Sequence, residues 1–216
     1  MQRNKAATLE RVLQSSVQEF ARKGFHMARV SDIASLARCS TETIYDVYIS
    51  KDGLFSAAVD HVIESHFGSV DVPTLFKTHL DGVDCPMDGL CRMATLFGKP
   101  LISETFLAIM LQVFGSGTKP PEQAVAAMQT RRNEFDAGLS ELVAEAQAQK
   151  LFDTGDATAA AHLILSTVGV VEAWRMRMFQ EAMTVAHIHE SARRAVRAFA
   201  TAEGRLRLDA LPPFEG

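Results

Sequence analysis

The most constraining feature of this sequence is a pair of short helical segments separated by only three residues. Residues 30–37 carry apolar side chains at the 3.6-residue period of a helix, and after a break at 38–40 the same period resumes from Thr41 to about Tyr48. Ser40 is placed to cap the second segment, because its hydroxyl can accept a hydrogen bond from a free amide of the first turn. The inward-facing residues are Val30, Ile33, Ala34 and Ala37, then Ile44 with Val47 or Tyr48. Two short helices around so tight a turn form a helix-turn-helix.

A longer helix is predicted on either side of this pair. Between residues 8 and 23 the apolar side chains form one stripe, and Gly24 follows where a helix C-cap belongs. After the pair, Ser50 can cap a helix over residues 51–66. We therefore expect a three-helix helix-turn-helix domain over residues 1–50, with 51–66 as a connecting helix.

The rest of the chain, residues 67–216, also follows a helical pattern. Proline and glycine divide it into predicted helices at about 86–98, 100–114, 120–149, 156–180 and 184–202, and the tail from Arg205 is expected to be frayed. No useful stretch alternates at the two-residue period of a strand. The expected fold class is all-α: an N-terminal helix-turn-helix domain and a C-terminal helical bundle.

Composition is typical of a globular cytoplasmic protein. Hydrophobic residues make up 47% of the chain, and its three cysteines lack CxxC spacing, which fits a reducing compartment. The N-terminus shows no apolar signal segment. The apolar run Ala157–Val171 is short for a bilayer span and ends in charged residues, so we expect a buried helix and no membrane partner.

The helix-turn-helix predicts binding to double-stranded DNA. In this geometry the first helix braces the second, whose outer face enters the major groove. Residues 1–60 carry eight Lys/Arg and seven Asp/Glu, whereas the whole chain has a net charge of −4, so the excess positive charge lies at this end. Lys51 is placed to bind a backbone phosphate. The outward positions of the second helix are Thr41, Glu42, Thr43, Tyr45 and Asp46. The alternative is an ordinary helical hairpin inside a core.

Residues 8–59 resemble the DNA-binding domain of TetR-type repressors over about fifty residues without insertion. The motifs are Phe20-Ala21-x-x-Gly24-Phe25, Val30-x-Asp32-Ile33-Ala34, Ser40-x-x-Thr43-Ile44-Tyr45 and Tyr48-x-Ser50-Lys51-x-x-Leu54-Phe55. The resemblance implies a homodimer that binds a palindromic operator and releases it when a small ligand enters the C-terminal domain. The expected DNA-binding residues are Arg29, Ser31, Arg38, Ser40, Thr41, Glu42, Thr43, Tyr45, Tyr48 and Lys51.

Several residues depart from the pattern of this family. Arg38 stands where a glycine usually ends the first helix of the motif, and a left-handed backbone there would be strained. Arg38 could offset that strain by reaching a phosphate. Glu42 and Asp46 make the second helix acidic: a carboxylate can accept from cytosine N4 but repels phosphate. Other departures are Arg29 for a hydroxyl N-cap, Val47 for an aromatic residue and Ile49 for Pro or Gly.

Methionine and aromatic residues fall on the predicted central helices of the C-terminal domain. Such side chains line adaptable apolar pockets, so we expect a small apolar or aromatic effector. The alternative for each residue is core packing. The candidate pocket residues are Met93, Phe97, Phe106, Met110, Met128, Phe135, Trp174 and Met178.

The last two long helices, 156–180 and 184–202, are the predicted dimer interface, because pairing them with a symmetry mate gives a four-helix bundle. The candidate interface positions are His162, Leu165, Val168, Val185, Ile188, Ala192, Val196 and Phe199.

Other classes of function lack a supporting motif. The histidines and cysteines do not have metal-ligand spacing, and there is no Gly-rich phosphate loop or GxSxG sequence. We therefore expect no metal, no cofactor and no catalytic residue. One alternative remains open: a ligand-binding or protein-interaction module on this scaffold whose acidic second helix binds DNA weakly.

Overall fold

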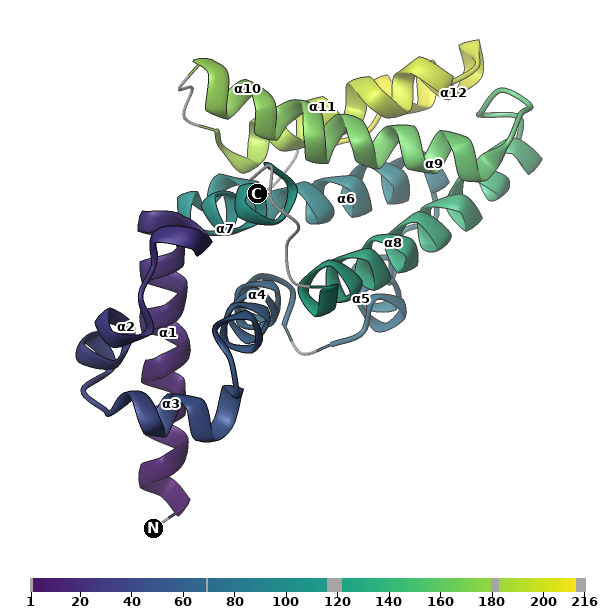
Figure 1. Cartoon of the computed structure of the whole chain (residues 1–216). Coiled ribbons are helices and arrows are strands. Elements are labelled where there is room, and N and C mark those ends of the chain that lie inside the picture. Colours follow the sequence, from purple (N-terminus) through teal and green to yellow (C-terminus); the bar gives the residue numbers. More distant parts are fainter. Residues whose placement is uncertain (1, 69, 116–121, 180–182, 213–216) are drawn as a thin grey trace. The chain divides into compact units, whose positions relative to one another are not determined.

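The computed structural model describes residues 2–68, 70–115, 122–179 and 183–212, which form helices joined by short turns (Figure 1). Within these ranges the only extended pairing is a single bridge between Phe152 and Ala200. The predicted all-α fold class is confirmed. The chain forms two compact units: unit 1 holds Met1–Ser69 and Ser103–Thr130, and unit 2 holds Val70–Ile102 and Arg131–Gly216.

Unit 1 contains the predicted helix-turn-helix, and the ends of α2 and α3 agree with the sequence prediction. The backbone of α1 changes direction at Gly24, whose φ of 77° is readily adopted only by glycine, as expected for the predicted C-cap. The helices of unit 1 are α1 (Gln2–Met27), α2 (Val30–Ala37), α3 (Thr41–Tyr48), α4 (Lys51–Phe67), α7 (Glu104–Gly115) and the first turns of α8 (Glu122–Ala148).

An aromatic cluster joins α1 to α4 in the core of unit 1. The Phe55 ring meets the Phe20 ring edge-on with centroids 5.0 Å apart, and the Phe25 ring lies 5.1 Å from it. Ile33 from α2 and Ile44 from α3 are also fully buried, so each short helix is anchored on the core by its apolar side.

Unit 2 is built around the packing of α6 against α11. Gly98 at the end of α6 allows this close approach, because a Cβ atom there would lie 2.4 Å from Val168 Cγ1 and 2.7 Å from Ile188 Cγ2. The elements of unit 2 are α5 (Val72–His79), α6 (Pro86–Gly98), the 3₁₀ turn η1 (Lys99–Ile102), the remainder of α8, α9 (Ala157–Ser166), the π-helical turn η2 (Thr167–Val171), α10 (Glu172–Phe179), α11 (Val185–Phe199) and α12 (Ala202–Asp209).

Two short helices were not predicted from the sequence. In α5, the Asp71 carboxylate accepts from the amide of Thr74 and caps the first turn. The expected frayed tail is wrong as far as Asp209, because α12 is helical there. Arg197 forms an ion pair with Asp209, and Arg193 Nη2 donates to the Leu208 carbonyl, so α11 holds α12 in place.

The apolar run after Ala157 is not buried on every side, which corrects a further expectation. Ala157–Arg175 is long and apolar enough to span a membrane by length and composition, but only 33% of that stretch is buried. Leu163, Val170, Val171, Trp174 and Met178 are exposed and form what we term the apolar stripe. Five of the predicted interface positions are wrong, because they lie inside the core of unit 2: Leu165, Val168, Ile188, Ala192 and Val196.

A strained turn separates α3 from α4. The amide of Ser50 donates to the Tyr48 carbonyl at 2.6 Å, which closes a γ-turn with Ile49 at its centre. Ile49 has a φ of 62° and a ψ of −43°, and its side chain is 85% exposed. A β-branched residue with positive φ is a conformational outlier, and this form of γ-turn is rare and strained. The isoleucine therefore carries a backbone cost without a compensating burial.

We predict that Ile49→Gly stabilises unit 1. A left-handed conformation costs an L-residue about 1–2 kcal/mol, which glycine avoids. The extra freedom of glycine in the unfolded chain offsets part of this gain in stability. The expected gain in unfolding free energy is roughly 0.5–1 kcal/mol, measured by urea denaturation. Ile102→Gly is the control, because Ile102 is also exposed but lacks a positive φ, and its replacement should destabilise. A loss of stability in Ile49→Gly would contradict the assignment of strain.

Candidate nucleic-acid interface

The turn between α2 and α3 is set by its first and last residues. Arg38 ends α2 in the left-handed conformation, with φ 54° and ψ 50°, and the Cys39 amide then donates to the Ala34 carbonyl at 3.0 Å. The strain expected for a non-glycine residue at Arg38 is therefore present. Ser40 Oγ accepts from the Thr43 amide at 3.2 Å, as predicted for the N-cap of α3. Together these groups fix the direction in which α3 leaves α2.

A lysine near the end of α1 links this helix to the first turn of α2. Lys23 Nζ lies 2.8 Å from Asp32 Oδ2 and also pairs with Glu19, whose side chain is only 1% exposed. Burial opposes the ionisation of Glu19, but hydrogen bonds from Lys23 and Arg22 outweigh it and lower the pKa of this carboxyl. The hydrogen bond from Lys23 likewise lowers the pKa of Asp32, while the same pairing raises the pKa of Lys23. The three charges thus hold α2 in one orientation.

The outer face of α3 is free, since Ile44 is its one buried residue. The predicted DNA-binding residues lie on α2, on α3 and next to the ends of these helices. Arg29, Ser31, Arg38, Ser40, Glu42 and Tyr45 are exposed, and Thr41, Thr43, Tyr48 and Lys51 are half-buried. Val47, one of two residues predicted to face inward, is exposed instead. The structure therefore leaves the hydroxyl and charged groups of α3 available to a partner.

Lys51 also has partners within the unit, and Tyr48 is half-buried there. Lys51 Nζ donates to the His26 carbonyl at 3.2 Å and sits 4.8 Å from the centroid of the Phe25 ring. Burial lowers the pKa of Lys51 and raises that of Tyr48. These contacts place the ammonium group at the start of α4, where it can share its donors with a phosphate.

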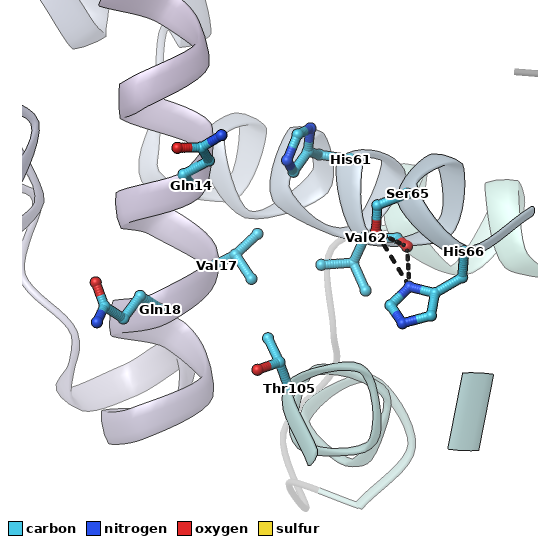
Figure 2. Close-up of a pocket in the computed structure, with 8 residues that line it drawn as sticks. All are labelled: Gln14, Val17, Gln18, His61, Val62, Ser65, His66 and Thr105. Atoms are coloured by element: carbon cyan, nitrogen blue, oxygen red, sulfur yellow. Dashed lines mark hydrogen bonds between the residues drawn. The ribbon is translucent and has the colours of Figure 1, made fainter. Parts of the chain in front are cut away.

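A crevice of about 310 Å³ lies between α1, α4 and α7 in unit 1. Figure 2 shows Val17 of α1 and Val62 of α4 pointing toward its middle, with Thr105 of α7 on the third side. His66 Nδ1 is hydrogen-bonded to the Val62 carbonyl at 2.8 Å, and its ring meets Phe106. The side of α4 next to α1 is thus incompletely packed. The other residues that line the crevice are Gln14, Gln18, His61 and Ser65.

The predicted effector residues fall in both units. In unit 1, Phe106 and Met110 are buried and Met128 is half-buried. In unit 2, Met93 is fully buried, and the Phe135 ring packs against Phe97 with centroids 5.2 Å apart. The last two predicted residues, Trp174 and Met178, belong to the apolar stripe. That stripe was missed as a surface, although its spacing of 7, 8, 11 and 15 residues from Leu163 marks one helix face.

The described residues contain no group of three or more His, Cys, Asp or Glu that could hold a metal ion. The features that indicate a function lie in unit 1 instead. They are the Ser40 cap of α3, the tight turn before α3, and the Lys23 link from α1 to α2. They define a helix-turn-helix DNA-binding protein.

Comparison with known families gives the same class. Residues 12–58 match the family of bacterial regulatory proteins called the tetR family, and residues 88–204, over half of the chain, match the C-terminal domain of AefR-like transcriptional repressors. The protein belongs to the TetR family of transcriptional regulators. A search of curated proteins gives no match.

Solved structures share the fold at low identity. A Mesorhizobium loti protein described as a TetR-family transcriptional regulator is 20% identical with a TM-score of 0.69, over 90% of this chain and 96% of its own. A Saccharomonospora viridis protein described as a transcriptional regulator in complex with choline is 18% identical with a TM-score of 0.71, over 93% and 100%. The superantigen PfiT is 18% identical with a TM-score of 0.66, over 91% and 97%.

We predict that Lys23→Met destabilises the protein at neutral pH, because it leaves the buried Glu19 and Asp32 with fewer partners. Both carboxyl groups have lowered pKa values in the folded state, so their pairing stabilises above their ordinary values of 4.5 and 3.8 and is lost as the pH falls below them. The difference in urea midpoint from the unmodified protein should therefore be largest near neutral pH and shrink below about pH 4.

Lys77→Met is the matched control for this change, because Lys77 is an exposed lysine in α5 with no described ion pair. A pH-independent difference in Lys23→Met, or an equal effect in the control, would show that Lys23 does not act through the two carboxylates.

Proposed function

We propose that this protein is a cytoplasmic, ligand-responsive repressor that binds a palindromic operator as a homodimer and has no enzymatic activity. The observation that carries the proposal is α3 itself: a capped helix, braced from behind, with an exposed outer face within a TetR-family chain. In this geometry α3 enters the major groove, and its N-terminal residues lie nearest the base edges.

Phosphate binding falls to groups at the two ends of α3. Arg38 lies before the helix and Lys51 after it, so the cations bracket the part that reads the bases. Arg29, at the start of α2, supplies another exposed guanidinium.

The apolar stripe is the proposed dimer interface. It places several large apolar side chains, including the only tryptophan of the chain, on one exposed helix face. Contiguous apolar surface of this kind favours association, and a two-fold contact lets the same face serve both subunits. His162 lies beside the stripe on α9 and stays among the proposed interface residues.

An effector can influence unit 1 through the covalent path of the chain. The C-terminal family region, 88–204, includes α7, which belongs to unit 1 and contacts both α1 and α4 there. A ligand that moves α7 or α8 therefore acts on α1 and α4, which support the helix-turn-helix. The crevice beside α4 leaves room for α4 to move. The ligand must bind one state better than the other to change the population. Buried methionine and phenylalanine side chains favour a small apolar or aromatic effector.

A protein-interaction module is the second candidate function. The acidic residues of α3 motivate it, and so does the occurrence of this fold in a protein described as a superantigen. Salt titration of binding to random duplex separates the two. A DNA-binding dimer loses affinity steeply as salt rises, with a slope of about −0.9 per phosphate contact, whereas weak binding with a flat salt dependence would favour the interaction module.

We predict that Arg38→Gln weakens binding to any duplex and reduces the salt slope by about 1.8 for a dimer, one phosphate contact per subunit. Glutamine keeps a polar side chain with hydrogen-bond donors and removes the charge. The measurement is fluorescence anisotropy on random duplex from low to moderate salt. The same change at Lys77, which lies outside the helix-turn-helix, should leave the slope unaltered, and an unchanged slope in Arg38→Gln would exclude the arginine as a phosphate contact.

We predict that Trp174→Glu disrupts the dimer. The indole is 62% exposed in the single chain, and placing a carboxylate at a buried interface position should weaken dimerisation by about 2 kcal/mol or more, roughly thirtyfold. Analytical ultracentrifugation measures the dimer, and gel shift measures the accompanying loss of operator binding. Leu206→Glu is the control, since Leu206 is equally exposed on α12. If the Trp174→Glu protein remains dimeric, the dimer interface does not lie on the apolar stripe.

A further inference from the structure

The face of α3 that would enter the groove bears hydrogen-bond acceptors and no cation. Residues 41–48 contain two carboxylates, Glu42 and Asp46, and no Lys or Arg. They are four residues apart, so they lie on the same side of the helix, and both are exposed. The positive charges sit at the flanks, on Arg38 and Lys51. The chain therefore separates the two tasks: cations meet the backbone, and carboxylates meet the base edges.

Glu42 lies in the first turn of α3, at the N-terminal end of this face. It is the second residue of α3 and is exposed, and hydrogen bonding to its own backbone and to Ser40 lowers its pKa. The group is therefore ionised at neutral pH and can only accept. A carboxylate has about four lone-pair sites, so an exposed one has sites with which to accept from a partner.

The chemistry of the major groove limits what this carboxylate can meet. In the major groove, guanine presents only acceptors, and thymine presents an acceptor and a methyl group. Neither base offers a donor to a carboxylate oxygen, and their acceptors repel it. Adenine has an amino donor, but its N7 acceptor lies beside it, whereas the amino group of cytosine is the favourable partner for Glu or Asp. On the proposed function as an operator-binding regulator, we infer that Glu42 selects a cytosine in each half-site.

The test uses selection of bound fragments from random DNA with the full-length protein, followed by binding to matched duplexes. The unmodified protein should recover a palindrome with a cytosine at one position of each half-site. Changing both of these pairs to A·T should weaken binding about tenfold or more. Glu42→Gln should reverse this preference, because the glutamine amide pairs with adenine N6 and N7.

The ratio of affinities for the two duplexes is the measured quantity, because the loss of a negative charge strengthens binding to all DNA. Asp52→Asn is the matched control: Asp52 is the second residue of α4, exposed, and loses the same charge. It should keep the cytosine preference. A purely structural role for Glu42 predicts a change in melting temperature with no change in this ratio, and would overturn the inference.

Two further outcomes distinguish the inference from the function on which it rests. A palindrome without a cytosine preference, or a preference that Glu42→Gln leaves intact, would refute the role of Glu42 and keep the regulator. Failure of all three proteins to select any palindrome would refute operator binding itself.

Discussion

A helix of eight residues has no independent stability in water, so everything that α3 does depends on the few contacts that anchor it. One apolar side chain, Ile44, fixes it to the core. The Ser40 hydroxyl caps its first turn, and the Lys23 bridge holds α2, which fixes the turn from which α3 starts. This economy has a functional consequence. Because so little of α3 is needed for folding, most of its surface is left for recognition.

The two ends of α3 concentrate backbone strain. Arg38 and Ile49 have positive φ without being glycine, and they bracket the helix. Strain of this kind persists only where the surrounding structure determines the conformation, and it gathers at functional sites. At Arg38 the chain gains a cation beside the reading helix in exchange. At Ile49 the side chain is 85% exposed, so burial does not account for the strain, and the two strained positions are not equivalent.

The sequence predicted the first unit far better than the second, and particular residues show why. The ends of α2 and α3 are determined locally, by the apolar period and by Ser40, so a linear reading finds them. Helix α12 depends on Arg193 and Arg197 from α11, which no local pattern reveals. The apolar run after Ala157 failed for another reason. A segment that is apolar on all sides does not indicate which side the core takes, and here Val168 faces Gly98 while Trp174 faces out. The effector residues were harder still to predict from the sequence, because a pocket depends on packing between helices that are distant in the chain.

If the protein binds an operator as proposed, the charge distribution explains how an acidic protein discriminates among DNA sequences. A net charge of −4 gives little general attraction to a polyanion, so binding must come from where the charges lie. On the proposed function, cations beside α3 attract the backbone at two points, and the proposed role of the α3 carboxylates is to repel any duplex that offers them no donor. Specificity is the difference between the affinities for matched and unmatched DNA. A repulsive group increases this difference as effectively as an attractive group does, when only the matched base relieves the repulsion. The acidic helix, which first suggests weak DNA binding, is then a means of keeping binding to unmatched sequence weak.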